Sequence, residues 1–397
     1  MIRQSERYKK SQASHGSFFG NFGDMWRKAR LDKVFFFIVV ALVSIGLLIF
    51  TSAALSILAE DPKQFYRLLL SQYVFGLIGG LVTGYLAYRI PYTFWKRHGI
   101  ALFALSIIST ALVFIPGLGV SNGGARRWIS FGGISVQPAE FLKVGFIIFA
   151  SAWYARVYRK VSNVRYGIIP LLGMLTLVGG VLLAQPDTGT FLVIAGTGVI
   201  MYFVSGARIK DLIILILMGL VGSSLLIATR PYLLSRINTF LNPANDPQGS
   251  SYQVRQAHIA LGSGGLWGRG YGQSVQKFNY LPEPIGDSVY AVLGEEVGFL
   301  GTMSVLLLFL GFALRGLHIA RRAPNMYARL LVIGCVVMIV VQSFLNIASI
   351  LGVFPLTGLP LMFISHGGTS LMVGLICVGL ILNVSQYKKR LRSDERT

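Results

Sequence analysis

The sequence predicts an all-α membrane protein with about ten transmembrane helices. The 397-residue chain is 54% hydrophobic and only 13% charged, whereas a soluble domain carries about 25% charged residues. Apolar runs of roughly 18 or more residues recur along it, and each is long enough to cross about 30 Å of hydrocarbon. Most connections between these runs are short. The composition therefore leaves little room for a soluble domain.

The apolar runs divide the chain into a transmembrane domain at 34–386 and two tails. The basic, Ser/Gly-rich tail 1–33 and the tail 387–397 lie outside it. The first run is too long for the apolar core of a signal peptide and no cleavage site follows, so we expect it to be retained. The ten predicted spans lie near 34–56, 68–88, 99–116, 138–155, 167–184, 189–205, 212–229, 288–314, 329–351 and 367–386.

The distribution of basic residues predicts the orientation of the chain. With both termini in the cytoplasm, 26 of the 36 Lys and Arg residues fall in cytoplasmic segments, as the positive-inside rule requires. The net charge of +21 is then explained by topology and by attraction to the anionic inner leaflet of the cytoplasmic membrane. We therefore expect no nucleic-acid partner.

Two outer loops stand out. The long loop 230–286, between the seventh and eighth spans, is rich in Pro, Gly, Asn, Gln and Ser, and loops of this length are typically functional or disordered. Within it, "SSYQVRQAHIALG" has helical spacing and predicts a short interfacial helix. The paired glycines of the loop 117–137 predict tight turns or a small hairpin.

The stretch "YLPEPIGDSVYAVLGEEVGFLG" (280–301) concentrates acidic residues in a chain that has only 15. A helix starting near Ser288 would place Asp287 as its N-cap. At about 100° per residue, small side chains share one face with Asp287, which favours close packing or a groove for a lipid-like ligand. Asp287 would then be a base that meets both water and a lipid-borne substrate, and simple capping is the alternative. The small residues are Ala291, Gly294, Gly298 and Gly301.

The other three carboxylates of this stretch cannot share the helix face of Asp287. Glu295 and Glu296 lie about two turns deeper and point elsewhere, and Glu283 precedes the helix. A charge near the bilayer centre costs about 2.5–3.5 kcal/mol on insertion scales, so at least one glutamate should pair with a base or face a polar cavity. Structural ion pairing and a functional role both stay open for Glu295 and Glu296, and Glu283 is a candidate support residue.

A second constellation lies in "GARRWISFGGISVQPAEFLKVGF" (124–146). Pro138 suits the first turn of a helix, which places Gln137 near the cap. Glu140 and Lys143 follow at helical spacing and can form an ion pair. The pair is either a structural element inside the bundle or the setting of a cation, Lys143, that binds an anionic ligand at the outer leaflet. On the second interpretation, Glu140 and Gln137 are also substrate-binding residues.

Two arginines in the preceding loop oppose the positive-inside trend. Arg126 and Arg127 are predicted on the outer side, and arginine is suited to bidentate phosphate contacts. Singly, each could equally contact lipid headgroups. Together with Lys143 and Trp128 they favour a phosphate site.

Weaker candidates lie in two other outer segments. Asp187 in "QPDTGT" (185–190) is equally a helix cap and a functional residue. In "LTGLPLMFISHGGTSLM" (356–372), Ser365, His366 and Thr369 could line the same outer cavity, although a lone histidine is more often a packed hydrogen-bonding residue.

The sequence contains no metal-ligand spacing, phosphate loop or nucleotide fingerprint. Cys335 and Cys377 lie in apolar runs and are expected to be free. We therefore expect no organic cofactor, no bound metal and no ATP-driven work. Dependence on a divalent cation cannot be read from the sequence.

Taken together, these motifs resemble the SEDS family (shape, elongation, division and sporulation). The resemblance rests on "GARRWISFGG", "ISVQPAEFLK", "QPDTGT", "PLTGLPLMFISHGGTSLM" and most of the loop 236–301, in the right order from the first span onward. The stretch "GQSVQKFNYLPEP" is closer to the division branch than to the elongation branch. Two departures are "IGDSVY", where many relatives have a "TDF"-like stretch but the aspartate is kept, and "SHGG", where a tyrosine commonly precedes the glycines.

The resemblance implies a ten-helix fold and peptidoglycan glycosyltransferase activity on lipid II. It implies a class B penicillin-binding protein transpeptidase as partner, together with other division proteins. The family's proposed catalytic aspartate corresponds to Asp287, and its polar cavity residues correspond to Arg127, Glu140 and Lys143.

The chemistry of lipid II suits these residues. Joining two units needs a base for the acceptor hydroxyl, for which we expect Asp287, and cations for the departing diphosphate, for which we expect Arg127, Lys143 and Arg126. Because helix spacing denies Asp287 a neighbouring carboxylate on its own helix, the expected outcome is inversion. Three alternatives remain: a polymerase of the elongation branch, a lipid II flippase and a non-enzymatic scaffold for the division machinery.

Overall fold

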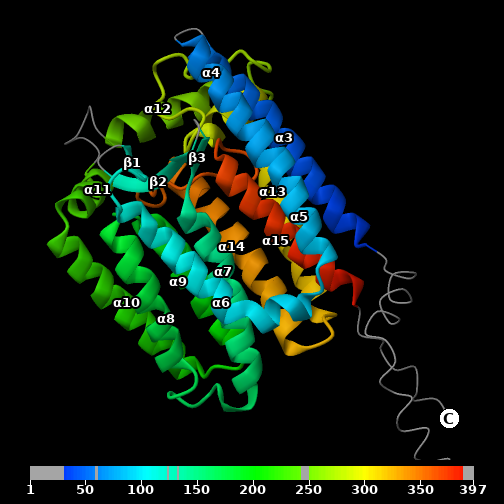
Figure 1. The fold of residues 1–397 in the computed structure, drawn as a ribbon. Coiled ribbons are helices and arrows are strands. Elements are labelled where there is room, and N and C mark those ends of the chain that lie inside the picture. The colour runs from blue at the N-terminus through cyan, green and yellow to red at the C-terminus, as the bar shows by residue number, and fades with distance from the viewer. Residues whose placement is uncertain (1–30, 59–60, 123–124, 132–133, 243–249, 388–397) are drawn as a thin grey trace, which may run out of the picture.

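The computed structural model describes residues 31–58, 61–122, 125–131, 134–242 and 250–387. These residues form a bundle of long helices, with a small sheet and short helices at one end (Figure 1). We call this end, where β1–β3 and α12 lie, the loop-rich end. The tails predicted at 1–33 and 387–397 lie almost entirely outside the described residues.

All ten predicted spans coincide with apolar helices, which confirms the all-α polytopic fold. In the described part of the chain, eight segments have the length and composition to cross a membrane, and two apolar helices of 17 residues, Ile168–Ala184 and Thr188–Val204, accompany them. One crossing, Pro62–Arg89, runs from α4 through a π-helical segment at Leu70–Ile78 into α5. The helices are α3 (Lys33–Leu58), α4 (Pro62–Leu69), α5 (Gly79–Arg89), α6 (Tyr92–Ala111), α7 (Pro138–Val157), α8 (Ile168–Ala184), α9 (Thr188–Val204), α10 (Ile209–Thr229), α11 (Pro231–Leu241), α12 (Ser250–Ser263), α13 (Val289–Arg321), α14 (Met326–Ile350) and α15 (Gly368–Gln386).

The core of the bundle is built around α14 and α15. The most apolar stretch of α15 is 94% buried and that of α14 is 72% buried, against 6% for α10 at the edge of the bundle. Close contact between α15 and α5 depends on missing side chains, because a Cβ atom at Gly379 would meet the backbone of Gly84. The central helices thus provide a fixed frame for the residues at the loop-rich end.

The loop 117–137 forms a three-stranded antiparallel sheet. Strands β1 (Gly119–Asn122), β2 (Ala125–Phe131) and β3 (Ile134–Val136) pair in the order β1-β2-β3, one strand more than the predicted hairpin. The sheet leads directly into α7, where Gln137 is the N-cap residue and Pro138 occupies the first turn. This confirms the predicted start of that helix.

The short helix predicted within the long loop is also present, as α12. It packs against the first part of α13, and α11 precedes it in the chain without having been predicted. The described part of the loop 230–286 therefore contains two helices, α11 and α12.

Helix α13 is interrupted at Gly298, where φ is +71° and ψ is −168°. The adjoining loop supplies hydrogen bonds there: the backbone N–H groups of Arg269 and Gly270 donate to the carbonyls of Glu295 and Glu296, both at 3.0 Å. Loop carbonyls accept in turn, since Phe299 N–H donates to the Gly265 carbonyl at 2.8 Å. The loop residues 264–270 thus run alongside the break.

The interruption corrects the predicted stripe of small residues on α13. A uniform helix was assumed, but the left-handed backbone at Gly298 breaks its periodicity. A Cβ atom at Gly294 would meet the Leu261 side chain, and one at Gly264 would meet the Gly294 carbonyl. The small residues therefore allow close packing of residues 261–268 and do not form an open lipid groove.

Candidate active site

Asp287 lies in the turn just before α13, and its side chain does not cap the helix as predicted. The helix begins at Val289, and the N-cap position falls one residue later than predicted, at Ser288, which makes no side-chain capping bond. The Asp287 carboxylate instead accepts a hydrogen bond from Nε2 of Gln253 on α12, at 2.9 Å. Gln253 also donates to Ser288 Oγ at 2.9 Å. A residue 34 positions earlier in the chain therefore orients this carboxylate.

The surroundings of Asp287 make it a stronger base than an ordinary aspartate. The side chain is half-buried, and burial raises the pKa of Asp287 from 3.8 to about 6. The negative charge of Glu283 raises the pKa further, whereas the hydrogen bond from Gln253 and the positive charge of Arg236 on α11 lower it. At neutral pH most Asp287 side chains are ionised and able to accept a proton.

The main chain at Asp287 is fixed by a buried amide of α14. Nδ2 of Asn346 donates to the Asp287 carbonyl and to the Leu359 carbonyl, both at 2.8 Å. Asn346 Oδ1 is buried and has no hydrogen-bond partner among the described residues. The turn carrying Asp287 is thus held from α12 through its side chain and from α14 through its backbone.

The predicted ion pair between Glu140 and Lys143 is present. Lys143 Nζ lies 2.7 Å from Glu140 Oε2 and donates to Gln342 Oε1 at 2.6 Å, and both charged side chains are buried. Gln342 also donates to the Pro360 carbonyl at 3.0 Å. In this conformation the Lys143 charge is therefore balanced inside the bundle and does not reach the surface.

Gln342 and Asn346 lie one turn apart on α14 and join the two predicted constellations. Gln342 contacts Lys143, Asn346 contacts Asp287, and both bind carbonyls of the segment 359–360. The sequence reasoning treated the two constellations separately. The connection is indirect, because Asp287 and Lys143 themselves share no direct contact.

The two arginines of β2 differ in their surroundings. Arg127 donates through Nε to the Gln185 carbonyl at 3.2 Å and through its terminal nitrogen to the Pro186 carbonyl. Arg126 is exposed. Arg127 therefore ties the sheet to the turn between α8 and α9, while Arg126 faces away from the bundle core.

Asp187 both caps α9 and joins the N-terminus of α7. Its Oδ1 accepts from the Thr190 N–H at 3.2 Å, and its Oδ2 accepts from Gln137 Nε2 at 3.2 Å. The backbone N–H of Gln137 donates to Thr369 Oγ1 at 3.2 Å. The capping interpretation of Asp187 is confirmed, and Gln137, Asp187 and Thr369 form one polar cluster.

Glu296 forms the ion pair that its depth in the helix predicted. Its Oε1 lies 2.8 Å from Lys277 Nζ and accepts from Ser52 Oγ on α3 at 2.5 Å. Lys277 Nζ also donates to Ser52 Oγ and to the Gly272 carbonyl, both at 2.9 Å. The pair is fully buried and fastens the long loop between α3 and α13.

Glu295 binds the same loop through different groups. It accepts from Ser274 Oγ at 2.6 Å and from the backbone N–H groups of Val275 and Gln276, each at 3.1 Å. The exposed Arg269 lies 3.6 Å away. Both glutamates therefore have structural contacts in this conformation, and neither contacts Asp287.

Ser365 and His366 belong to the segment before α15. Ser365 Oγ accepts from the Leu361 N–H at 2.8 Å. The His366 ring stacks on Phe50, and its Nε2 is buried without a hydrogen-bond partner among the described residues. The His366 N–H donates to the Ile285 carbonyl at 2.7 Å, two residues before Asp287. This segment thus supports the Asp287 turn through its main chain.

Several residues around Asp287 were missed from the sequence. Gln342 and Asn346 carried a signal, since two amides four residues apart in an apolar run share a helix face. Arg236 carried another, as an outer-loop arginine against the positive-inside trend. Gln253 carried none. Within the described ranges, no three His, Cys, Asp or Glu side chains gather in a way that could hold a metal ion.

The comparisons with known proteins agree with this architecture. Residues 32–390 match the FtsW/RodA/SpoVE family, described as "Cell cycle protein". The chain is 38% identical to Stage V sporulation protein E of Bacillus subtilis, covering 91% of this chain and 99% of that protein. It is 36% identical to a probable peptidoglycan glycosyltransferase FtsW of Trichlorobacter lovleyi, covering 91% and 94%.

Solved structures show the same fold. A chain of a peptidoglycan synthase complex that coordinates polymerization and crosslinking matches with a TM-score of 0.72 at 27% identity, covering 91% of this chain and 99% of that one. The rod shape determining protein RodA of Thermus thermophilus matches with a TM-score of 0.67 at 26% identity, covering 92% and 99%. The chain, a multi-pass membrane protein, belongs to the FtsW/RodA/SpoVE family of cell cycle proteins, the SEDS family that its motifs indicated.

Proposed function

We propose that this protein is a peptidoglycan glycosyltransferase that polymerises lipid II at the outer face of the cytoplasmic membrane. The observation that carries the proposal is Asp287, a half-buried carboxylate with a pKa of about 6 in a turn oriented by Gln253 and Asn346. Relatives named as probable peptidoglycan glycosyltransferases support it. In this proposal both termini are cytoplasmic, so the loop-rich end faces outward.

The reaction joins two lipid-linked units by displacement at a sugar carbon. The acceptor 4-hydroxyl attacks the carbon that carries the diphosphate, the carbon–oxygen bond to the diphosphate breaks, and the polyprenyl diphosphate leaves with the bonding electrons. Asp287 takes the proton of the hydroxyl. A positioned base contributes about 10²–10⁴-fold to such a step, and the pKa near 6 keeps this base ionised at neutral pH.

The departing diphosphate needs positive charge. Arg236 is the cation that acts on Asp287 electrostatically, and we add it to the predicted Arg126, Arg127 and Lys143. Lys143 can contribute only if its contacts with Glu140 are loosened, because that pair is buried. Glu140, which pairs with Lys143, and Gln137 stay proposed substrate-site residues, and Asp187 supports Gln137 through a hydrogen bond.

We propose inversion as the stereochemical course, although Asp287 does have a carboxylate nearby. Glu283 acts on Asp287 through its charge, a neighbour that reasoning from the helix alone had missed. In this proposal Glu283 tunes the pKa of Asp287 and does not act as the second carboxylate that a retaining enzyme needs about 5–5.5 Å from the first, across the reacting bond. Comparing the anomeric configuration of the product linkage with that of lipid II by NMR decides the matter.

Septal synthesis during division, with a class B penicillin-binding protein and other division proteins, is the proposed context. FtsW-named relatives at 33–36% identity support it. The similarity to a sporulation protein makes spore envelope synthesis the second candidate context. Depletion in growing and in sporulating cells, followed by microscopy of septa and spores, separates the two. A flippase gains no support from the buried pairs Glu140–Lys143 and Lys277–Glu296, because their charges are balanced internally.

The test is polymerisation of lipid II by the purified protein in proteoliposomes, alone and with a class B penicillin-binding protein. Wild type should make glycan chains and Asp287→Asn should make none. Equal polymerisation by both would remove Asp287 from the mechanism. If neither makes chains with the correct partner, a lipid II translocation assay on the same vesicles would decide between flippase and scaffold. Addition of Mg²⁺ or a chelator in the same assay measures dependence on a divalent cation.

A further inference from the structure

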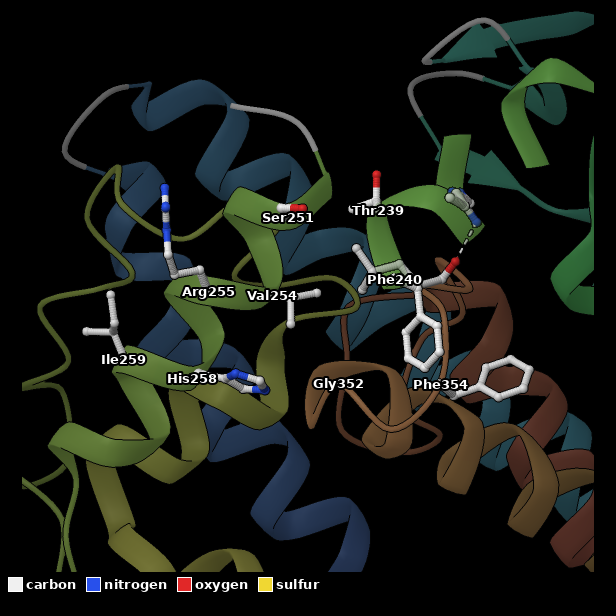
Figure 2. A pocket seen from close by; sticks show the side chains of 11 residues that line it. Thr239, Phe240, Ser251, Val254, Arg255, His258, Ile259, Gly352 and Phe354 are labelled. Atoms are coloured by element: carbon white, nitrogen blue, oxygen red, sulfur yellow. Dashed lines mark hydrogen bonds between the residues drawn. The ribbon is translucent and has the colours of Figure 1, made fainter. Parts of the chain in front are cut away.

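A cavity of about 500 Å³ lies between α11, α12 and the turn that follows α14. Figure 2 shows the α12 side chains Ser251, Val254 and His258 on one side and Phe240 of α11 with the turn at Gly352 on the other. Sites for small molecules typically measure about 300–1,000 Å³. The cavity is lined by Arg236, Thr239, Phe240, Ser251, Val254, Arg255, His258, Ile259, Gly352, Phe354 and Leu356.

The cavity is built for an anion. Its lining contains two arginines and a histidine but no carboxylate. Arg236 is anchored by a hydrogen bond from Nη1 to the Leu356 carbonyl at 2.8 Å, and its charge also acts on Asp287. The cavity therefore adjoins the proposed base through this arginine.

A buried hydroxyl in the lining lacks a partner. Ser251 is 6% exposed, and its Oγ has no hydrogen-bond partner among the described residues. Buried polar groups are nearly always hydrogen-bonded, to protein, water or ligand. Ser251 thus offers a donor to whatever fills the cavity, and a phosphate oxygen fits that role.

The remaining lining is largely apolar. Phe240, Val254, Ile259, Phe354 and Leu356 supply most of it. A free inorganic anion gains nothing from such side chains, whereas a prenyl chain does, because burying apolar surface is favourable. Cations on an apolar wall match an amphiphile with a diphosphate at one end.

We propose that this cavity is a second polyprenyl diphosphate subsite, which holds the diphosphate and first isoprene units of one of the two lipid-linked chains. The inference rests on the proposed function, because polymerisation brings two such chains to one base. The predicted cations Arg126, Arg127 and Lys143 would then serve the other chain. Arg236, which lines the cavity and acts on Asp287 through its charge, would link the two sites.

The test is photolabelling of the full-length protein in nanodiscs with a diazirine analogue of farnesyl diphosphate, followed by peptide mapping. We expect labels within 251–259 or 352–356, competed by farnesyl diphosphate and at least tenfold more weakly by inorganic pyrophosphate. Ser251→Leu, which fills the cavity, should reduce labelling there at least tenfold. Ser263→Leu, the same change on α12 outside the cavity, should leave labelling within twofold of wild type.

A second pair of variants tests the charge. Arg255→Gln should weaken labelling severalfold, and Arg230→Gln, at an exposed arginine that begins α11 outside the lining, should not. Undiminished labelling of the cavity peptides in Ser251→Leu, or labelling only near Arg126 and Arg127, would overturn the proposal. Equal competition by pyrophosphate would overturn the assignment to a prenyl ligand.

The Asp287→Asn variant separates this proposal from the proposed function. It should label the cavity like wild type while making no glycan. Glycan synthesis by wild type without cavity labelling would contradict the subsite proposal and leave the proposed glycosyltransferase function standing. Specific cavity labelling without glycan synthesis, even with the partner protein, would support a lipid diphosphate site and contradict the proposed polymerase function.

Discussion

Two carboxylates of one short stretch, Asp287 and Glu296, have opposite fates. Glu296 is fully buried, paired with Lys277 and hydrogen-bonded to Ser52. Asp287 is half-buried, accepts one hydrogen bond from Gln253 and has a raised pKa. A buried charge that is paired with a cation and hydrogen-bonded holds elements together, whereas a partly desolvated carboxylate without a directly paired cation retains the capacity to take a proton. A structural ion pair and a proposed catalytic base thus lie nine residues apart in the sequence.

The largest expected effect comes from removing the base. Asp287→Asn should lower the polymerisation rate by about 10²–10⁴-fold, the usual contribution of a general base, with folding unchanged because the amide oxygen can still accept from Gln253. The rate is measured on lipid II in proteoliposomes. Asp61→Asn, at an exposed helix cap of α4, is the matched control and should retain the wild-type rate. A polymerisation rate of the Asp287→Asn variant within threefold of wild type would contradict the assignment of Asp287 as the base.

Breaking the buried pair should affect stability first. Lys277→Met leaves Glu296 buried without its cation and should destabilise the fold by about 3–5 kcal/mol, read as a lower thermal midpoint in detergent. The double variant Lys277→Met with Glu296→Leu should recover much of the loss. Arg269→Met, which removes the exposed partner of Glu295, should cost under about 1 kcal/mol. Equal losses in the two single variants would show that burial of the pair is unimportant.

The pH dependence of the rate reports the base directly. Because only ionised Asp287 accepts a proton, the polymerisation rate should fall about tenfold per pH unit below a midpoint near pH 6. Gln253→Leu removes a hydrogen bond that lowers the pKa, so the midpoint should move to higher pH, and Glu283→Gln removes a charge that raises it, so the midpoint should move lower. A midpoint unmoved by both changes would assign the acid limb to another group.

Stability should depend on the same group with a definite sign. The pKa of Asp287 is higher in the folded protein than its ordinary 3.8, so between these values the folded state binds more protons than the unfolded state. Stability from Asp287 is then fully present at low pH and is lost as the pH rises through about 6. The difference between wild-type and Asp287→Asn midpoints, measured from pH 4 to 7, should show this trend and vanish if Asp287 is unperturbed.

The smallest effect concerns the second glutamate. Ser274→Ala removes one hydrogen bond to Glu295 but leaves the two backbone N–H donors, so we expect a loss of about 1 kcal/mol. Thermal unfolding measures it, with polymerisation kept near the wild-type rate. Loss of activity without loss of stability would move Glu295 from a structural to a functional role.

Local rules predicted what depends on neighbours in sequence. Hydropathy located the ten spans, Pro138 marked the start of α7, and spacing paired Glu140 with Lys143. The contacts of Asp287 lie beyond such rules, because Gln253 is 34 residues away and Asn346 is 59. Only the folded bundle brings these residues together.

The break in α13 was missed for a related reason. Glycines at 294, 298 and 301 are compatible with a continuous helix as well as with an interrupted one. The interruption depends on backbone groups of the loop, which form hydrogen bonds with the helix backbone beside Gly298. The cap at Asp287 failed by one residue, within the usual uncertainty of helix ends, yet that residue decides whether the carboxylate is used up in capping or open to a substrate.

The contact between α13 and the loop residues 264–270, which we call the seam, is made by main-chain hydrogen bonds. These bonds decide which of its positions tolerate substitution. The side chains of Leu266 and Trp267 are 63% and 80% exposed, although the backbone beside them is hydrogen-bonded. A saturation library should therefore tolerate most substitutions at these two positions. Gly264, Gly268 and Gly298 should tolerate almost none, because any Cβ there meets backbone. Sequence differences between related proteins would then concentrate at the exposed positions of the seam, while its backbone conformation stays the same.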